Sequence, residues 1–423
     1  MTARRRAVAT IAAVGLSVAL LVVGLAGGYF AAVTTTPPQV VEKQVELPTK
    51  TIKIGMTISK SGPFAPLDSD YDKFNKAWQD WINEQNLVIN NTRVKFEVTS
   101  LDDSSDPGKA VQLYTRLATQ DKVDILVSPY SADIGLQLIP IAEQNQVPMI
   151  MAEASTARMW TGENHWISTS MVPYWEKGTN GWSASYFQML ESNKWAKTIA
   201  FVGWDITWAS DDHKSSVALA KQIGLDVVYD VLLQPNFANP DFTAQITTLK
   251  GLNPDIVYLS MFGPFSAIFI KQANDQGFRP KEWHSIEWGA SFLPTLGSLA
   301  EGATSEIFWT PNFNFYQTDI FKQLLNQAGM DWKVWQWIEL RMIIFQMIVQ
   351  ALHDSAIRNP SDPFSKASIN DALHKLQMMT ISGPLITQPQ GYGTVGLVPI
   401  QIQNGKIVTI WPTNLADARY VHP

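Results

Sequence analysis

The sequence predicts an α/β fold of two similar lobes, each built around a parallel central sheet. Short apolar runs alternate with amphipathic helical patterns between residues 93 and 156, and the alternation begins again after residue 171. A local match supports the repeat: Asp124-Ile125 leads to Tyr130-Ser131-Ala132, and Asp255-Ile256 leads to Phe265-Ser266-Ala267. Because this match is short, chance is an alternative explanation.

The segment from Arg93 to Thr156 predicts a β-α-β-α-β unit. Alternating residues 94–98 indicate a strand, and the apolar runs 123–127 and 147–151 indicate two buried ones. Asp106 and Pro107 suit the cap and first turn of a helix. The strands should be parallel, with right-handed crossovers, so ligands should gather where strands end. These places are residues 128–132 and 153–156.

Ser131 should cap the helix between the second and third strands, and Pro140 should kink or split that helix. Before this unit, residues 51–56 predict a strand, residues 59–64 its following loop, and Tyr71–Glu84 a helix. Asn90 begins a glycosylation sequon, whose use depends on the host.

Residues 1–33 are predicted to be a membrane anchor or a signal peptide. Arg4–Arg6 precede a long apolar run without acids, which favours a retained spanning helix with the rest of the chain outside. The alternative is a cleaved signal peptide, because Phe30-Ala31-Ala32 offers small residues near a possible cleavage site. Residues 34–50, rich in Thr and Pro, are predicted to be a linker.

Composition excludes several classes of function. The net charge is −6, and the exported part is more acidic still without the three N-terminal arginines, which argues against nucleic acid as a partner. The chain has no cysteine, so neither a disulfide nor a cysteine nucleophile exists. Asp211-Asp212-His213 is interpreted as a solvated helix start, and the G-x-G-x-x-G match at Gly391 as a turn. We therefore expect no metal, no cofactor and no catalysis.

The second lobe and the C-terminal part continue the alternation. Strands are predicted at 198–202, 227–233, 255–259, 283–286, 394–403 and 406–411. Helices are predicted around Trp182–Leu190, at 211–223, from Asn239-Pro240-Asp241 onward, and at 266–276, 332–356 and 366–376. Within the longest of these, Arg341 should snorkel or pair with an acid.

From about residue 51 to residue 411 the chain resembles the type I periplasmic binding proteins of the branched-chain amino acid and amide type. The resemblance rests on the order and spacing of Ser61-Gly62-Pro63, Asp102-Asp103, Asp106-Pro107, Ala110-Val111, Val147-Pro148-Met149-Ile150, Ser155-Thr156, Phe242–Ile246, Asp255–Tyr258, Lys271-Gln272-Ala273, Gly277 and Ser382–Leu385. It implies two Rossmann-like lobes joined by a three-segment hinge. Lobe 1 would comprise 51–172 plus 312–383, and lobe 2 would comprise 173–311 plus 384–423.

The resemblance also implies function and site residues. The protein would be an extracytoplasmic monomer that binds a small solute and passes it to the permease of an ABC importer. Ser131, Ser155 and Thr156 match the positions that hold a ligand oxygen, and Trp208 matches an aromatic that packs on the ligand. A helix start offers free N–H groups for such an oxygen.

One departure from the family concerns the ammonium of an amino-acid ligand. The family's acid at this point is replaced by Phe265, which puts a standard α-amino acid in doubt. Aromatic residues are expected around the cleft instead: Phe64, Tyr130, Trp208, Phe262, Phe265 and Trp288. They suit a flat, uncharged or aromatic solute, or a cation held by ring faces, although several could be ordinary core.

Asp133 and Glu153 flank the predicted site. They either compensate a helix dipole or await a cationic or amide ligand. Two other functions stay open: an anchored surface or sensory protein without an importer, and, less favoured, an enzyme on the same scaffold.

Overall fold

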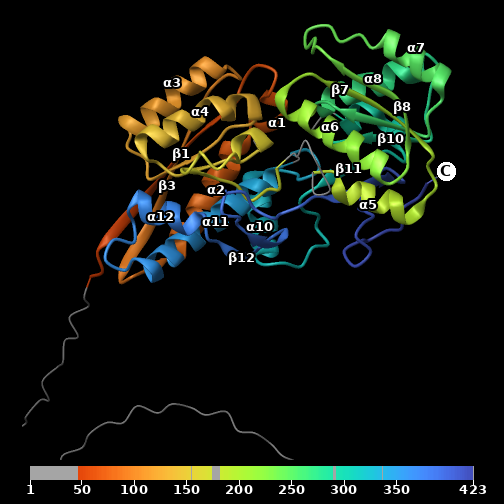
Figure 1. The fold of residues 1–423 in the computed structure, drawn as a ribbon. Helices are drawn as coiled ribbons and strands as arrows, with labels where there is room; N and C mark the ends of the chain where they lie inside the picture. The colour runs from red at the N-terminus through yellow and green to blue at the C-terminus, as the bar shows by residue number, and fades with distance from the viewer. Residues whose placement is uncertain (1–45, 154, 174–181, 289–291, 336, 423) are drawn as a thin grey trace, which may run out of the picture. The chain divides into compact units, whose positions relative to one another are not determined.

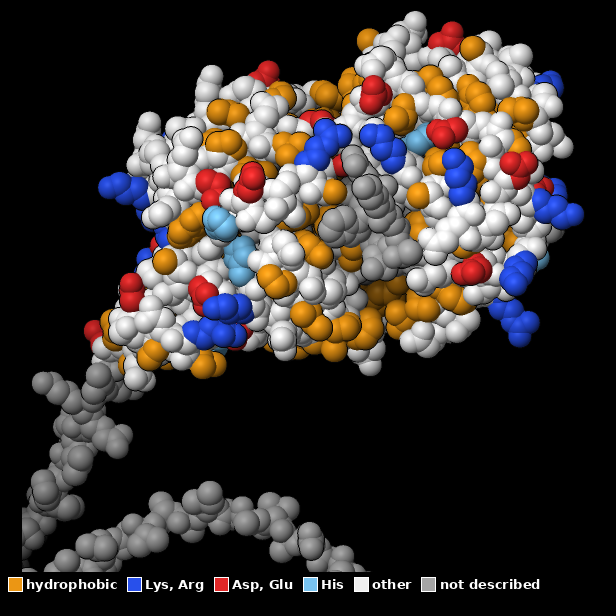
Figure 2. All heavy atoms as spheres, viewed as in Figure 1, with side chains coloured by type: hydrophobic (Ala, Val, Ile, Leu, Met, Phe, Trp, Pro, Cys, Tyr) orange, Lys and Arg blue, Asp and Glu red, His pale blue; other side chains and the backbone are white. Residues whose placement is uncertain are grey.

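The computed structural model describes residues 46–153, 155–173, 182–288, 292–335 and 337–422. The predicted anchor or signal peptide (1–33) and most of the predicted linker (34–50) lie outside these residues. Within them, no helix combines the length and apolarity needed to cross a membrane. Figure 2 shows acidic and basic side chains interspersed over the face in view, without separation by sign.

The first sheet has the order β2-β3-β1-β4-β5-β6, parallel throughout except for the β2–β3 pair. Its strands are β1 (Thr49–Ile58), β2 (Val88–Ile89), β3 (Thr92–Asp102), β4 (Ile125–Val127), β5 (Met149–Ile150) and β6 (Ile167–Ser168). Its N-terminal helices are α1 (Ala65–Asp68), α2 (Tyr71–Glu84), α3 (Pro107–Thr119) and α4 (Ala132–Asn145). Strand order reverses at β1 and β4, the kind of position where α/β folds bind ligands.

The second sheet has the order β15-β14-β11-β10-β9-β7-β8. The pairs β11–β14 and β14–β15 are antiparallel, and the other neighbouring pairs are parallel. Its strands are β7 (Thr198–Trp204), β8 (Asp226–Leu233), β9 (Ile256–Ser260), β10 (Glu282–Ser285), β11 (Thr304–Ile307), β14 (Val398–Gln403) and β15 (Lys406–Thr409). The accompanying helices are α5 (Ala184–Asn193), α6 (Thr207–Gln222), α7 (Thr243–Leu252), α8 (Gly263–Asp275) and α9 (Phe292–Leu296). Figure 1 shows the two groups of elements as separate lobes.

Three C-terminal helices return to the first lobe: α10 (Thr318–Ala328), α11 (Ile338–Arg358) and α12 (Lys366–Leu373). Trp78 of α2 stacks on Phe345 of α11 with ring centroids 3.9 Å apart, and Phe74 meets Phe321 of α10 at 5.6 Å. Burying such a ring contributes about 1.5–3 kcal/mol, so these contacts attach the late helices to the early sheet. A short hairpin follows, formed by β12 (Gln377–Thr380) and β13 (Gly383–Ile386).

The chain crosses between the lobes three times: between β6 and α5, between β11 and α10, and between β13 and β14. Met171 of the first crossing pairs with Val395 of the third in a parallel bridge. The exact limits of the two lobes along the sequence stay a prediction. Gly391 lies in the third crossing, where its backbone oxygen accepts a hydrogen bond from the Thr169 N–H at 2.9 Å.

Several sequence predictions need correction. Helix α4 runs unbroken through Pro140, so that proline does not split it. The longest helix begins at Ile338 and not at residue 332, and α8 begins at Gly263, which places Ser266 inside the helix and not at its start. The Ser-Ala match between the lobes therefore does not describe equivalent helix starts. Helix α7 begins at Thr243, after the Asn-Pro-Asp sequence.

The predicted solvated start at residues 211–213 is also wrong. Asp211, Asp212 and His213 are all buried in the first half of α6. The carboxylate of Asp212 accepts hydrogen bonds from the hydroxyls of Ser260 at 2.8 Å and Tyr258 at 3.2 Å. These partners lie on β9, far along the chain, and they satisfy a group that the local sequence suggests would face water.

Candidate ligand-binding site

A small cavity lies between the lobes, at the carboxyl ends of their strands. Lobe 1 supplies Tyr130 and Ser131 from the loop after β4 and Glu153 from the segment after β5. The remaining lining residues are Leu340 and Trp337 at the start of α11, together with Trp182, Trp208, Ile286 and Glu287. The cavity has a volume of about 20 Å³, room for a single water-sized group.

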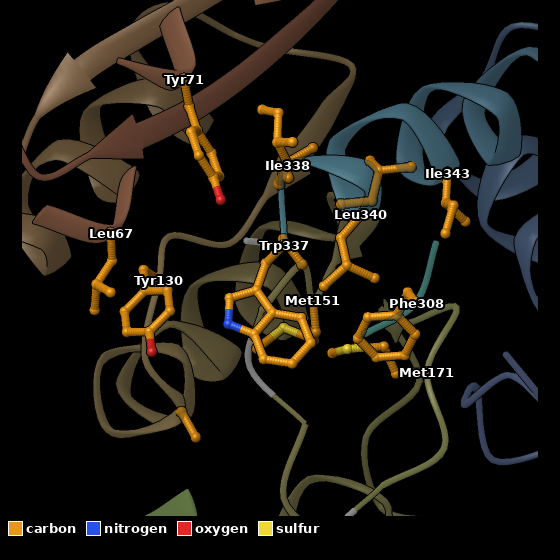
Figure 3. Packing of buried hydrophobic residues seen from close by; sticks show 14 of the residues in the cluster. Leu67, Tyr71, Tyr130, Met151, Met171, Phe308, Trp337, Ile338, Leu340 and Ile343 are labelled. Atoms are coloured by element: carbon orange, nitrogen blue, oxygen red, sulfur yellow. The ribbon is translucent and has the colours of Figure 1, made fainter. Parts of the chain in front are cut away.

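Aromatic rings form a large part of its wall, supplied by Tyr130, Trp182, Trp208 and Trp337. Trp208, on the first turn of α6, is only 6 % exposed, and Trp182 packs against Trp337 with centroids 5.3 Å apart. In Figure 3 the indole nitrogen of Trp337 points to the side on which Tyr130 lies, and Leu340 closes the space beside that indole. The wall therefore offers both ring faces and polar ring edges to a bound group.

Three hydrogen bonds from a hydroxyl group to a carboxylate join the lobes around this cavity. The Tyr130 hydroxyl donates to Glu287 Oε2 at 2.9 Å. The Thr207 hydroxyl donates to Asp133 Oδ1. The Thr156 hydroxyl donates to Asp211 Oδ2. Each bond links a residue of lobe 1 to a residue of lobe 2, so together they hold the lobes in this arrangement.

Ser131 is placed by an unusual backbone conformation. Its φ is +84°, a region that non-glycine residues seldom adopt, and its hydroxyl accepts a hydrogen bond from the Asp133 N–H at 3.3 Å. It therefore caps α4 as predicted, and it lines the cavity as well. The start of α8 is equally constrained, because a Cβ on Gly263 would lie 1.9 Å from the backbone oxygen of Trp288.

The site is rich in buried carboxyl groups. Burial raises the pKa of Glu287 to about 8, against the lowering effect of hydrogen bonds from Tyr130 and Trp337. Burial likewise raises the pKa of Glu339 to about 8 and raises that of Glu153, which the Arg341 charge lowers in turn. Glu287 is therefore largely protonated at neutral pH.

Arg341 places a positive charge beside this cavity. It is fully buried on α11, and its Nε lies 3.5 Å from Glu153 Oε1. The sequence predicted that this side chain would either snorkel or pair with an acid, and in the structure it pairs with Glu153. Its guanidinium carbon also lies 5.4 Å from the ring centroid of Tyr71, a cation–π distance.

Of the predicted site residues, Tyr130, Ser131 and Trp208 line the cavity. Phe64 and Phe262 stand behind this wall: the Phe64 ring lies 5.5 Å from Tyr130, and the Phe262 ring lies 5.3 Å from Trp208. They support the lining residues from the second layer. A role of any of these residues in ligand binding stays a prediction.

The other four predicted residues are engaged elsewhere. Phe265 packs on Trp204 at 4.5 Å, and Trp288 stacks on Phe292 at 5.4 Å. The Ser155 hydroxyl accepts a hydrogen bond from the Trp160 indole at 3.2 Å. Thr156 makes the bond to Asp211 described above. None of these four is among the lining residues of the cavity.

Sequence reasoning missed Glu287, Trp182, Trp337, Ile286 and Leu340. The search for an acid on lobe 2 stopped at the loop after β9, whereas Glu287 follows β10, the next strand of the same sheet. Because the carboxyl ends of parallel strands lie at the same edge of a sheet, the loop after β10 should also have been searched, and Glu287 would have been found. The local sequence does not mark Trp337 as a cavity residue, because the long helix was predicted to begin before it and to include it.

Two α/β lobes with three crossings and a lined cavity between them define a two-lobe solute-binding protein. The sequence model of the family described as Periplasmic binding protein matches residues 51–405, and the chain belongs to this family. The matching model is that of the type I proteins of this family, the branched-chain amino acid-binding type, whose members are periplasmic solute-binding proteins of ABC transporters and not enzymes.

Solved structures share the fold. A leucine binding protein from Thermotoga maritima is 17% identical with a TM-score of 0.68, covering 85% of this chain and 98% of its own. An ABC transporter solute binding protein from R. palustris, in complex with 4-hydroxybenzoate, is 18% identical with a TM-score of 0.69, covering 85% and 95%. A branched chain amino acid ABC transporter protein from Thermus thermophilus with bound valine is 17% identical with a TM-score of 0.69, covering 87% and 98%.

Proposed function

We propose that this chain is the extracytoplasmic receptor of an ABC importer and that its lobes close around a small polar or aromatic solute. The observation that carries the proposal is the cavity at the carboxyl ends of both sheets, lined by Tyr130 and Ser131 from one lobe and Trp208 and Glu287 from the other. A solute bound there contacts both lobes at once. Its binding energy therefore favours the closed arrangement over the open one.

The solutes named for structures of the same fold support this type of ligand. They include valine and 4-hydroxybenzoate, small molecules with a polar end. With 17% and 18% identity these structures do not name the solute of this chain. The family of the chain supports delivery of the solute to permease subunits, and we propose that the receptor acts as a monomer.

Closure can be measured because the chain has no cysteine of its own. Gln112→Cys on α3 and Lys271→Cys on α8 introduce one exposed label site on each lobe. Spin-label distances between them should shorten and narrow when a solute that raises the melting temperature is added. A distance distribution that a saturating, stabilising solute leaves unchanged would contradict the clamp.

The N-terminal segment completes the proposal. We propose that residues 1–33 tether the receptor to the outer face of the membrane through an uncleaved helix, with residues 34–50 as spacer. Intact-mass analysis of the membrane fraction should find Arg4–Arg6 retained. A mature start between Ala31 and Thr36 would show instead that the segment is a signal peptide.

A further inference from the structure

We propose that residues 412–422 form a strap on lobe 2 that loosens as the pH rises, because it is attached to Glu282, a buried carboxyl group that must then ionise. These residues follow β15 and contain no helix or strand. In Figure 1 they belong to the blue end of the chain, on the second lobe. None of them lines the cavity between the lobes, so the behaviour of the strap is independent of the solute.

Tyr420 is the strap residue that reaches into the interior of lobe 2. It is half-buried between two exposed neighbours, Arg419 and Val421, and like Trp195 it packs against the apolar core of this lobe. Its hydroxyl donates a hydrogen bond to Glu282 Oε2 and accepts one from the Trp195 indole N–H at 2.8 Å. The strap is therefore attached to a carboxyl group on strand β10.

Among the described residues, Glu282 has only neutral partners. It is 2 % exposed, and its Oε1 accepts hydrogen bonds from the hydroxyls of Tyr186 on α5 at 2.5 Å and Thr304 on β11 at 2.9 Å. The neighbouring Lys281 pairs with Asp255 instead, at 2.7 Å. Burial therefore raises the pKa of Glu282 from 4.5 to about 7, against the lowering effect of the three hydroxyl groups.

The other titratable groups around Glu282 keep one form between pH 5 and pH 8, with one exception. Burial raises the pKa of Tyr186 and of Tyr420 and lowers that of His284 on the same strand, so all three stay neutral. The exception is Glu306, whose pKa burial raises to about 8. Glu306 lies 3.8 Å from His284 and accepts a hydrogen bond from the Tyr186 N–H, so it belongs to the interior of the lobe and not to the strap.

The strap also holds the second crossing between the lobes. The Leu415 backbone oxygen accepts a hydrogen bond from the side-chain amide of Asn312 at 2.6 Å, and Asn312 lies between β11 and α10. The Asp417 and Ala418 N–H groups donate to the Thr409 backbone oxygen at 3.1 and 3.2 Å. Release of the strap would remove these bonds and free a segment that connects the lobes.

The effect of pH on the attachment follows from linkage. With the strap in place the pKa of Glu282 is about 7, whereas water reaches this carboxyl group when the strap is released and its pKa falls towards 4.5. A raised pKa in the attached state gives stability that is complete below 4.5 and is lost as the pH rises to about 7. Between pH 5 and pH 8 the equilibrium constant for release should increase by at most about 70-fold, and it should then level off.

Hydrogen exchange of the full chain without solute, followed by mass spectrometry between pH 5 and pH 8 and corrected for intrinsic exchange rates, measures release directly. Peptides covering 412–422 report the amides of Asp417, Ala418 and Val421, and β9 is the reference for unfolding of the lobe. Protection of the strap should fall about tenfold or more from pH 5 to pH 8. It should stay below that of β9 throughout, and a peptide covering 308–317 should lose protection with the strap.

Two variants separate the carboxyl group from the ring. Glu282→Gln keeps an acceptor for Tyr420 but cannot ionise, so protection of its strap should fall less than about twofold over the same range. Tyr420→Ala removes the attachment and should lower protection of the strap at pH 5 about tenfold or more. The matched controls are exposed residues, Glu191→Gln on α5 and Tyr316→Ala, and both should keep the wild-type response.

Three results would overturn the proposal. The first is a wild-type strap whose protection changes less than about twofold over this range. The second is a full pH response in Glu282→Gln, which would transfer the effect to His422, stacked on Trp195 with ring centroids 5.7 Å apart. The third, loss of strap protection without change in peptide 308–317, would remove the link to the second crossing. Because no solute is present, none of these results bears on the proposed receptor function.

Discussion

Replacing Arg341 with methionine tests how the buried pair with Glu153 is stabilised. Arg341 is fully buried, and its Nε lies 3.5 Å from Glu153 Oε1. In the variant, burial alone acts on the Glu153 carboxyl group, so the folded protein keeps it protonated. The unfolded chain ionises it above its ordinary pKa of 4.5. The pH dependence of unfolding therefore measures the contribution of the pair.

The magnitude follows from linkage. Holding the carboxyl group neutral costs about 1.4 kcal/mol for each pH unit above 4.5, so at most about 3.4 kcal/mol at pH 7 and about 0.7 kcal/mol at pH 5. A raised folded pKa gives stability that is complete below 4.5 and is lost as the pH rises. Arg341→Met should therefore be far less stable than the wild type at pH 7 and close to it at pH 5.

Urea unfolding at both pH values, followed by circular dichroism, measures this difference. The double variant Glu153→Gln/Arg341→Met has no charge to desolvate and should regain most of the loss at pH 7. Arg358→Met, at the exposed end of the same helix, should cost less than about 1 kcal/mol at either pH. Equal losses at pH 5 and pH 7, or a double variant no better than the single one, would refute the reasoning.

Three further predictions concern the site and the core. Trp208→Ala should weaken binding of the solute by about 2–4 kcal/mol, and Ser131→Ala by about 1–1.5 kcal/mol, both measured by calorimetry. Burial raises the pKa of Glu306 from 4.5 to about 8. The stability that the protonated carboxyl group contributes is therefore present at low pH and is lost as the pH rises towards 8. Glu306→Gln should reduce the fall in the free energy of unfolding between pH 5 and pH 9 by roughly 3–5 kcal/mol, measured by thermal unfolding. Gly263→Ala should cost on the order of 1–3 kcal/mol, because its Cβ would lie 1.9 Å from a backbone oxygen, whereas Gly251→Ala meets nothing within 4 Å and should be neutral or stabilising.

Each of these has an outcome that contradicts it. Unchanged affinity in Trp208→Ala would remove that ring from the binding wall. Parallel stability curves for the wild type and Glu306→Gln would show that this carboxyl group ionises normally in the fold. A Gly263→Ala protein as stable as Gly251→Ala would mean that the loop after β10 adjusts freely.

Elements with strong local signals were predictable from the sequence. Helix α2 spans Tyr71–Glu84 as expected, and α3 begins at Pro107 with the Asp106 carboxylate accepting from the Lys109 N–H at 2.6 Å. In both, the apolar stripe and the end signals lie within the segment itself. No long-range partner is needed to place them.

The failures share a cause, which is that their partners lie far along the chain. Asp212 looks like a surface residue in its own helix and is buried because Tyr258 and Ser260 on β9 satisfy it. The rule about strand ends located Tyr130 and Ser131 correctly within the cavity lining. It did not locate Trp337, which reaches the cavity from a segment whose helix begins later than its apolar pattern suggested.

The three hydroxyl-to-carboxylate hydrogen bonds between the lobes bear on the balance between open and closed arrangements. Thr156–Asp211, Thr207–Asp133 and Tyr130–Glu287 include no solute atom, so they favour closure whether or not a solute is bound. Such contacts would raise the population of the closed form before binding, so that a solute would need less differential affinity to complete the shift. If the proposed permease recognises the closed form, these contacts would contribute to the rate at which it meets that form without solute. Breaking one of them would lower that background and sharpen the response to solute, at the expense of affinity.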